Sequence, residues 1–235
     1  MANMRPNRIN TLGNINNASK YLEIGVCKGL TFSEIEIPNK DAVDPYFAFD
    51  YVSQASESVR FFEVPSDTFF QQYSNEARQY DVIYLDGLHE FNQTFRDFCA
   101  TLSMSHKGTI WLIDDTVPSS NYAALPSQAD ARKYRDMVGD KQNAWMGDVY
   151  KVIFAIHDFF PQLSLRTFKS HGQTVVWQEP RTEFSPIFNS LEEIGSMQFV
   201  DFLEHKKAAF GFATDDEIFA DVARTFSSEV VDSAA

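Results

Sequence analysis

The sequence predicts an α/β fold with a doubly wound sheet, and three observations support this prediction. Short apolar runs alternate along the chain with segments of helical periodicity, as expected for strands and helices that follow one another. A glycine-punctuated turn, Gly25 to Gly29, follows the first apolar run, where an open α/β sheet binds its ligand. The chain has 235 residues with 44% hydrophobic content, which suits one large α/β domain or one domain plus an appendage.

Composition and charge exclude several classes of partner. The formal net charge is −13 and the isoelectric point is near 4.7, so there is no excess of Lys and Arg to neutralise phosphates or anionic lipid. No apolar run approaches the roughly 20 residues that span a bilayer, and the first residues lack the apolar core of a signal peptide. Two cysteines, Cys27 and Cys99, are too few for a disulfide framework, and we read both as reduced packing residues. We expect a cytoplasmic protein without nucleic-acid or membrane partners.

The first predicted strand, residues 20–26, leads into the glycine turn. Gly25 and Gly29 carry no Cβ, so the backbone can approach a ligand closely there. We expect a short helix after the turn, stopped by Pro38, whose first amides would face that ligand. The alternative reading is a tight turn of the kind found in any βα unit.

Polar residues follow the next two predicted strands. Asp44 ends the strand at 42–44 about 20 residues after Gly25, where a carboxylate is placed to accept hydrogen bonds from ribose hydroxyls. The alternative is an Asp that caps an Asp-Pro turn. Ser66 follows the strand at 59–64, and it either contacts the base of a ligand or caps the next helix.

Acidic residues follow two further strands, predicted at 81–86 and 108–113. The polar residues at these two strand ends are Asp86, His89, Asp114 and Asp115. Because neighbouring parallel strands end at the same edge of a sheet, we expect these four side chains to converge. A buried acidic pair needs compensation, either from a divalent cation with oxygen ligands or from hydrogen bonds to helix N-termini.

The remainder of the chain divides into an irregular segment, two strands and a helical end. Residues 116–146 are irregular, and an interruption of this length in an α/β domain is typical of a lid or binding loop. Strands at 163–168 and 174–177 are joined so closely that they must pair antiparallel. Helices then follow, including one predicted through Ile187, Leu191 and Ile194. The domain prediction is an N-terminal arm at 1–18, which is either a loose arm or a poorly marked helix, a cofactor-binding domain at 19–180 and a C-terminal helical extension at 181–235.

Six motifs in order resemble the class I S-adenosylmethionine-dependent methyltransferases, and most closely the macrocin-type branch that methylates hydroxyls of sugars and natural products. The motifs are LEIGVCKG at 22–29, VDP at 43–45, SDTFF at 66–70, DGLHE at 86–90, IDD at 113–115 and WMGDV at 145–149. The resemblance covers roughly residues 19–178. It implies a Rossmann-like sheet of seven strands, mostly parallel, with an antiparallel last strand.

The resemblance also implies roles for individual residues. The predicted S-adenosyl-L-methionine contacts are Glu23, Gly25, Val26, Gly29, Asp44, Ser66, Asp86 and Gly87. The positions that match magnesium ligands of the macrocin-type branch are Asp86, Asp114 and Asp115. That branch carries an acidic base where this chain has Leu88, so we assign the base to the adjacent His89, with Asp115 as the second catalytic residue. The alternative is that His89 only contacts the adenine side of the cofactor or caps its helix.

The predicted function is methylation of a hydroxyl on a sugar or natural product, so the expected partner is a small-molecule or glycan acceptor. Two other classes stay open. A nicotinamide-dependent oxidoreductase would share the glycine turn and Asp44, although Cys27 stands where a second close glycine is expected. The other open class is a non-catalytic, cofactor-binding subunit of a larger assembly. The C-terminal helices could pack on the body or form a homodimer.

Overall fold

The structure is a computed structural model that describes residues 4–73, 78–141 and 144–232. The chain forms two compact units. The first comprises Met1–Gly87, Asp97–Leu112 and Asp215–Ala235, and the second comprises Leu88–Arg96 and Ile113–Thr214. The first three residues of the predicted arm and residues 142–143 of the predicted lid lie outside the described part of the chain.

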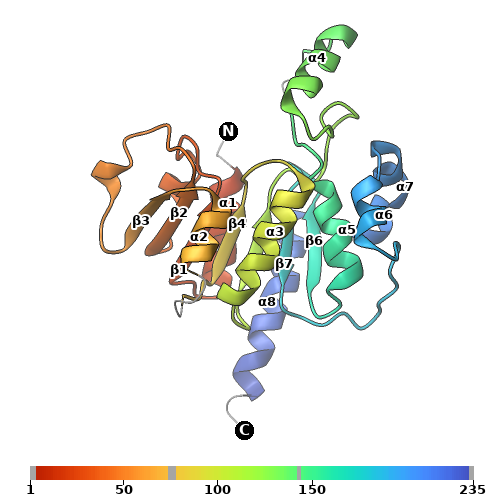
Figure 1. Ribbon diagram of the computed structural model, residues 1–235. Coiled ribbons are helices and arrows are strands. Elements are labelled where there is room, and N and C mark those ends of the chain that lie inside the picture. Colours follow the sequence, from red (N-terminus) through yellow and green to blue (C-terminus); the bar gives the residue numbers. More distant parts are fainter. Residues whose placement is uncertain (1–3, 74–77, 142–143, 233–235) are drawn as a thin grey trace. The chain divides into compact units, whose positions relative to one another are not determined.

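The first unit contains a parallel sheet in the order β3-β2-β1-β4-β5. Its strands are β1 (Lys20–Ile24), β2 (Asn39–Asp44), β3 (Val59–Glu63), β4 (Val82–Leu85) and most of β5 (Ile110–Ile113) (Figure 1). The pairs β1–β2, β1–β4 and β2–β3 are parallel, as predicted. Every residue of β4 and β5 is buried, and these strands are continuous apolar runs because both faces of the sheet are covered.

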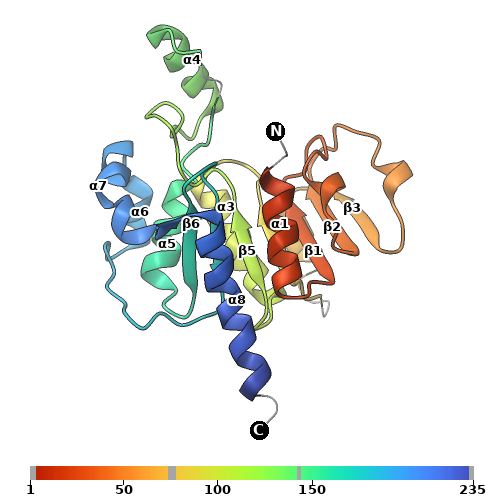
Figure 2. The same ribbon diagram turned by 180° about the vertical axis from the view of Figure 1, so that it is seen from behind.

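Helices cover both faces of this sheet. Figure 2 shows α1 (Met4–Ile15) and α8 (Asp215–Asp232) side by side on one face, where they contact each other. On the other face lies α2 (Ser66–Tyr73), and α3 (Phe91–Thr101) runs from the second unit into the first. The segment predicted as a loose arm or poorly marked helix is therefore a helix from Met4 onward.

The prediction of a helix after the glycine turn is wrong. The structure has only the 3₁₀ turn η1 (Phe32–Glu34) between β1 and β2. The connection is short, because β2 begins at Asn39, directly after Pro38. The Lys40 ammonium donates to the carbonyls of Phe32 and Ile35, at 3.1 Å each, and so satisfies acceptors that a helix would otherwise use. Two further 3₁₀ turns are η2 (Val52–Gln54) and η3 (Leu102–Met104).

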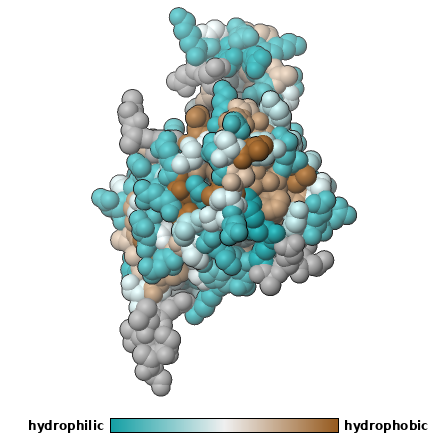
Figure 3. All heavy atoms as spheres, turned by 90° about the vertical axis from the view of Figure 1, so that its left-hand side faces the viewer, coloured by the Kyte–Doolittle hydropathy of each residue, from teal (hydrophilic) through white to brown (hydrophobic). Residues whose placement is uncertain are grey.

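Hydrophobic side chains are exposed beside the glycine turn. Leu30, directly after Gly29, is 66% exposed, and Tyr46, two residues after Asp44, is 69% exposed. Figure 3 views the molecule from the left-hand side of Figure 1, and hydrophobic residues interrupt the hydrophilic surface there. Cys27 is also exposed, so its prediction as a packing residue is wrong, whereas Cys99 is partly buried.

The second unit contains β6 (Ser164–Phe168), β7 (Thr174–Trp177) and β8 (Phe212–Ala213). The β6–β7 pair is antiparallel, as predicted, and β8 adds a parallel partner to β6. The described residues therefore contain eight strands where seven were predicted. The two-residue β8 is too short to leave a periodic pattern.

In the second unit, α5 (Tyr150–Phe159) is buried at almost every residue and contacts α6 (Leu191–Ser196) and α7 (Phe199–Ala209). The predicted helix through Ile187 begins only at Leu191, because Ser190 caps it by accepting from the Glu193 amide. No helix in the described part of the chain combines the length and the apolar character needed to traverse a bilayer.

The segment predicted as an irregular lid contains a helix, α4 (Gln128–Val138). The Ser127 side chain caps its first turn, and Gly139 ends it with a left-handed φ of 72°. Only Ala131 of this helix is buried, so no apolar stripe marked it in the sequence. In Figure 1, α4 projects away from the other helices of its unit.

Candidate active site

Asp44 organises the glycine turn in the first unit. Its Oδ2 accepts hydrogen bonds from the amides of Val26 and Cys27, both at 2.8 Å. Its Oδ1 accepts from the Tyr46 amide at 2.8 Å. The contact with the Tyr46 amide confirms the cap of the Asp-Pro turn that was the alternative prediction, whereas the role of the carboxylate in fixing the backbone between the two glycines was not predicted.

Both glycines of the turn are required by close packing and by left-handed backbone angles. Gly25 has a φ of +90°, and a Cβ there would lie 2.0 Å from the Asp86 carbonyl oxygen. Gly29 has a φ of +70°, and its Cβ would lie 2.9 Å from the ring of Phe49. Each position is thus closed to larger residues by the protein itself, before any ligand is considered.

Glu23 is buried beneath this turn, with 1% of its surface exposed. The Tyr21 hydroxyl donates to its Oε2 at 2.5 Å. Burial is the main reason why the pKa of Glu23 rises to about 8, and the nearby Asp86 raises it further. The pKa of about 8 therefore favours the protonated, uncharged form of this carboxyl group at neutral pH.

The other predicted cofactor residues lie at strand ends of the same unit. Ser66 begins α2 just after β3, where it is partly buried. Asp86 and Gly87 follow β4 directly, and the Tyr84 hydroxyl donates to Asp86 Oδ2 at 3.3 Å. A Cβ on Gly87 would meet its nearest neighbour, Ile24, at an ordinary 3.5 Å, so packing alone does not require this glycine.

In the second unit, His89 is held by two groups. Its Nδ1 lies 3.0 Å from Asp115 Oδ2, and its ring stacks on that of Trp145 with centroids 4.9 Å apart. Asp115 itself is buried and has a left-handed φ of 56°, which is uncommon for a residue other than glycine and occurs where a side chain must be aimed. Nδ1 also lies 3.4 Å from the Trp145 carbonyl oxygen, so both of its neighbours are acceptors and a proton on Nδ1 suits this position.

The WMGDV motif at the end of the lid segment fixes the His89 loop from the other side. Gly147 has a φ of +63°, and a Cβ there would lie 1.6 Å from the His89 carbonyl oxygen. Asp148 accepts from the Phe91 amide at 2.7 Å and pairs with Lys151 at 3.0 Å. No role for this motif was predicted from the sequence. The adjacent Gly147 and Asp148 were the sequence signal from which a turn in close contact with another loop could have been predicted.

Asp114 and Asp115 have different surroundings, although both are buried. Asp115 faces His89, whereas Asp114, which is 2% exposed, is not among the described residues whose metal-ligating atoms gather around His89. Thr116 fixes the backbone after this pair, because its hydroxyl donates to the Gly172 carbonyl at 2.8 Å.

A groove lies in the second unit between the lid segment and α7. Its volume is about 530 Å³, which is in the range of small-molecule sites. Aromatic and aliphatic side chains dominate its lining, among them Tyr122, Tyr134, Tyr150, Phe199 and Leu203. Leu125 also lines it and accepts from Trp145 Nε1 at 2.7 Å, so the groove is connected to the ring that stacks on His89.

The strand order and the glycine turn define a Rossmann-like α/β fold. Residues 22–116 match the family model of a methyltransferase domain, a span that contains the motifs from LEIGVCKG to IDD. The resemblance to methyltransferases is thus confirmed for this segment, while the match does not distinguish the macrocin-type branch. It does not support the nicotinamide-dependent alternative.

Solved structures share the fold at low sequence identity. The O-methyltransferase TomG from Streptomyces achromogenes, which is involved in tomaymycin synthesis and was solved with SAM, is 11% identical, with a TM-score of 0.53 over 76% of this chain and 81% of that chain. Cofactor-bound Rv0187 from MTB is 13% identical, with a TM-score of 0.53 over 77% of this chain and 82% of that chain. No curated protein matches the sequence.

Proposed function

We propose that this protein is an S-adenosylmethionine-dependent methyltransferase that methylates a hydroxyl group on a sugar or natural product. The single observation that carries the proposal is the His89–Asp115 pair, in which His89 belongs to the DGLHE motif after β4 and Asp115 to the IDD motif at the end of β5. The methyltransferase-domain match over residues 22–116 supports the cofactor half of the proposal.

The first unit offers a surface that suits adenosylmethionine. Asp44 Oδ1 accepts one hydrogen bond from the Tyr46 amide. Because a carboxylate oxygen has two lone pairs, Oδ1 can also accept a hydrogen bond from a ribose hydroxyl. Leu30 and Tyr46 expose apolar surface beside the glycine turn, and the nucleoside would cover this surface. The neutral Glu23 carboxyl under the turn adds no negative charge at the methionine end. We assign the cofactor to Glu23, Gly25, Val26, Gly29, Asp44, Ser66, Asp86 and Gly87.

The second unit supplies the base. When bound, the cofactor supplies a methyl group activated by a sulfonium. A sugar hydroxyl is a poor nucleophile, so His89 Nε2 accepts its proton as the oxygen attacks, and Asp115 stabilises the resulting imidazolium. Because His89 follows Asp86 by three residues, their Cα atoms lie at most about 11 Å apart, whatever the placement of the two units.

The groove of the second unit is our candidate for the acceptor site. Its aromatic rings can stack on a sugar or a polycyclic natural product, and its link through Leu125 to Trp145 leads to the imidazole of His89. The lid segment forms one of its walls, so we infer that acceptor identity is set by residues 121–134.

A magnesium ion at Asp86, Asp114 and Asp115 stays a prediction from the resemblance. Mg²⁺ prefers an octahedral set of oxygen ligands. In the second unit the buried Asp115 carboxylate is paired with an imidazole nitrogen, and Asp114 does not belong to the group of ligating atoms around that nitrogen. We route no step through a metal.

Replacement of His89 or Asp115 tests the proposal. We expect His89→Ala and Asp115→Asn to reduce turnover by roughly 10²-fold or more, the usual contribution of a positioned base. Calorimetry should show adenosylhomocysteine binding to both variants as it does to the parent protein. His106→Ala is the matched control, because His106 pairs with Asp81 at 2.9 Å in the first unit, and its removal should leave turnover intact.

The outcomes separate the candidate functions. Unchanged turnover in both variants would end the assignment of His89 as base. Cofactor binding without turnover on any hydroxyl acceptor, in the parent protein, would instead support a non-catalytic partner subunit. An absence of heat with adenosylmethionine would contradict the proposal as a whole.

A further inference from the structure

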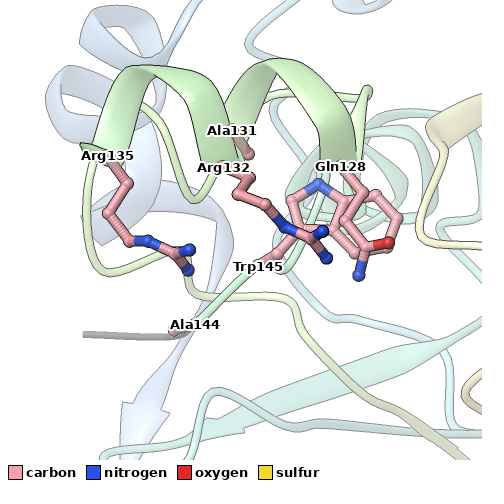
Figure 4. Close-up of a pocket in the computed structure, with 6 residues that line it drawn as sticks. All are labelled: Gln128, Ala131, Arg132, Arg135, Ala144 and Trp145. Atoms are coloured by element: carbon pink, nitrogen blue, oxygen red, sulfur yellow. The ribbon is translucent and has the colours of Figure 1, made fainter. Parts of the chain in front are cut away.

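A small cationic pocket lies on the lid segment, beside Trp145. Figure 4 shows Arg132 and Arg135 extending from α4 on the side of the helix where Trp145 and Gln128 lie. The pocket measures about 130 Å³ and is lined by Gln128, Ala131, Arg132, Arg135, Ala144 and Trp145. Its polar side chains are hydrogen-bond donors or amides, and none of its lining residues is acidic.

The charge of this pocket is opposite to that of the chain. The protein carries a net charge of −13, yet two guanidinium groups one turn apart face the same small space. The Arg135 guanidinium lies 3.6 Å from the carboxylate of the exposed Asp136, which does not line the pocket. Two arginines in one pocket can bind a carboxylate or phosphate through paired N–H donors, a geometry that lysine does not offer.

Trp145 connects this pocket to the proposed catalytic residue. The same indole lines the pocket and stacks on the His89 ring. Its Nε1 donates to the Leu125 carbonyl at 2.7 Å, which helps to fix the ring. A group bound by the arginines would therefore lie beside the residue that also stacks on the imidazole.

We propose that the Arg132–Arg135 pocket binds an anionic group, a carboxylate or a phosphate, carried by the methyl acceptor. This proposal rests on the proposed function for the identity of the ligand. It narrows the acceptor class from any hydroxylated sugar or natural product to acidic ones. The pocket volume fits one such group, while the remainder of the acceptor extends toward His89 or into the groove.

Calorimetry with three matched sugars tests the proposal on the full chain. The probes are glucose, glucuronate and glucose 6-phosphate, which differ in carrying no anion, a carboxylate or a phosphate, and inorganic phosphate is a fourth. We expect at least one charged sugar to bind about tenfold or more tightly than glucose, since charge-assisted hydrogen bonds are the strong ones. The tighter of the two charged sugars identifies the anion.

Substitutions locate the binding. Arg132→Gln and Arg135→Gln should each weaken binding of the charged sugar about tenfold while glucose binding is unchanged. Lys133→Gln is the matched control, because it removes the same charge from the same helix without lining the pocket. An equal effect of Lys133→Gln would indicate a general field of the helix and would overturn the proposal. So would the absence of saturable binding for both charged sugars and inorganic phosphate at millimolar concentrations.

A titration with adenosylhomocysteine on the same samples separates this proposal from the proposed function. Charged sugars that bind through Arg132 while adenosylhomocysteine does not bind would leave the anion site standing and contradict the methyltransferase assignment. Adenosylhomocysteine binding without any preference for charged sugars would support the methyltransferase assignment and contradict the anion site.

Discussion

At the scale of single residues, Glu23 makes stability depend on pH. Its pKa is about 8 in the folded protein, against a usual value of 4.5. Below pH 4.5 both folded and unfolded states hold the proton, whereas between pH 4.5 and 8 only the folded state does. The free energy of unfolding therefore falls as the pH rises through this window, by at most about 1.4 kcal/mol per pH unit. Above pH 8 both states have lost the proton.

Glu23→Gln should remove this dependence. The amide keeps the acceptor for the Tyr21 hydroxyl and cannot ionise, so we expect the variant to gain stability relative to the parent as the pH rises from about 5 to about 8. Urea unfolding across that range measures the difference. Glu34→Gln, at an exposed position, should follow the parent at every pH. Parallel stability curves for Glu23→Gln and the parent protein would show that Glu23 ionises normally when buried.

At the scale of elements, the lid segment returns to the His89 loop through a close contact at Gly147. Gly147→Ala would combine a left-handed φ with a clash against the His89 carbonyl, so the two segments must separate. We expect a loss of roughly 3 kcal/mol or more in stability, together with loss of turnover, because strain and displacement add. Urea unfolding and the methyl-transfer assay measure the two effects.

Gly139 provides the matched comparison. It has a φ of +72°, but a Cβ added there would have no atom of the described residues within 4 Å. Gly139→Ala should therefore cost only the backbone strain, about 1–2 kcal/mol, and leave turnover intact. Equal effects at the two glycines would mean that the contact between Gly147 and His89 is unimportant.

Prediction from sequence succeeded where a single periodic pattern was enough. The strands β4, β5 and β7 were recovered because each is a continuous buried apolar run. The strand β2 begins at Asn39, three residues before the predicted range of 42–44, because its first residues are polar. The helix α4 was missed because it buries only Ala131, and the helix after Gly29 was predicted although the link to β2 has room only for a 3₁₀ turn.

The candidate site was predictable only in part, for a related reason. The site residues Asp44, Asp86 and Asp115 could be predicted, because each is a polar residue at the end of an apolar strand. The stacking of Trp145 on His89 joins segments 56 residues apart and depends on a turn geometry that no local pattern encodes. The protonated state of Glu23 likewise follows from burial, which the sequence does not display.

At the scale of the whole molecule, a partly buried ion pair joins segments far apart in the chain. Arg8 on α1 is 1% exposed and forms two hydrogen bonds to Asp215 at the start of α8, at 2.8 and 3.0 Å. The partner carboxylate is 41% exposed. Asp215→Ala should cost about 3 kcal/mol, because it removes the carboxylate that compensates a buried charge. Arg8→Met should cost less, because the remaining carboxylate reaches water. Urea unfolding measures both.

The exposed pair Arg224–Asp221 on α8 is the control. Arg224→Ala should change stability by less than about 0.5 kcal/mol, as is usual for a solvent-exposed pair within a helix. A cost for Asp215→Ala no larger than this would show that Arg8 is hydrated in solution.

The contact between α1 and α8 has a consequence for biosynthesis. Arg8 leaves the ribosome 207 residues before Asp215, and residues 113–214 of the other unit emerge in between. At about 5–20 residues per second, roughly 10–40 s separate the synthesis of Arg8 from that of Asp215, and about half of this interval follows the synthesis of β5. During that half the sheet face of the first unit lacks the cover of α8, and a chaperone that shields apolar surface would find its binding site there.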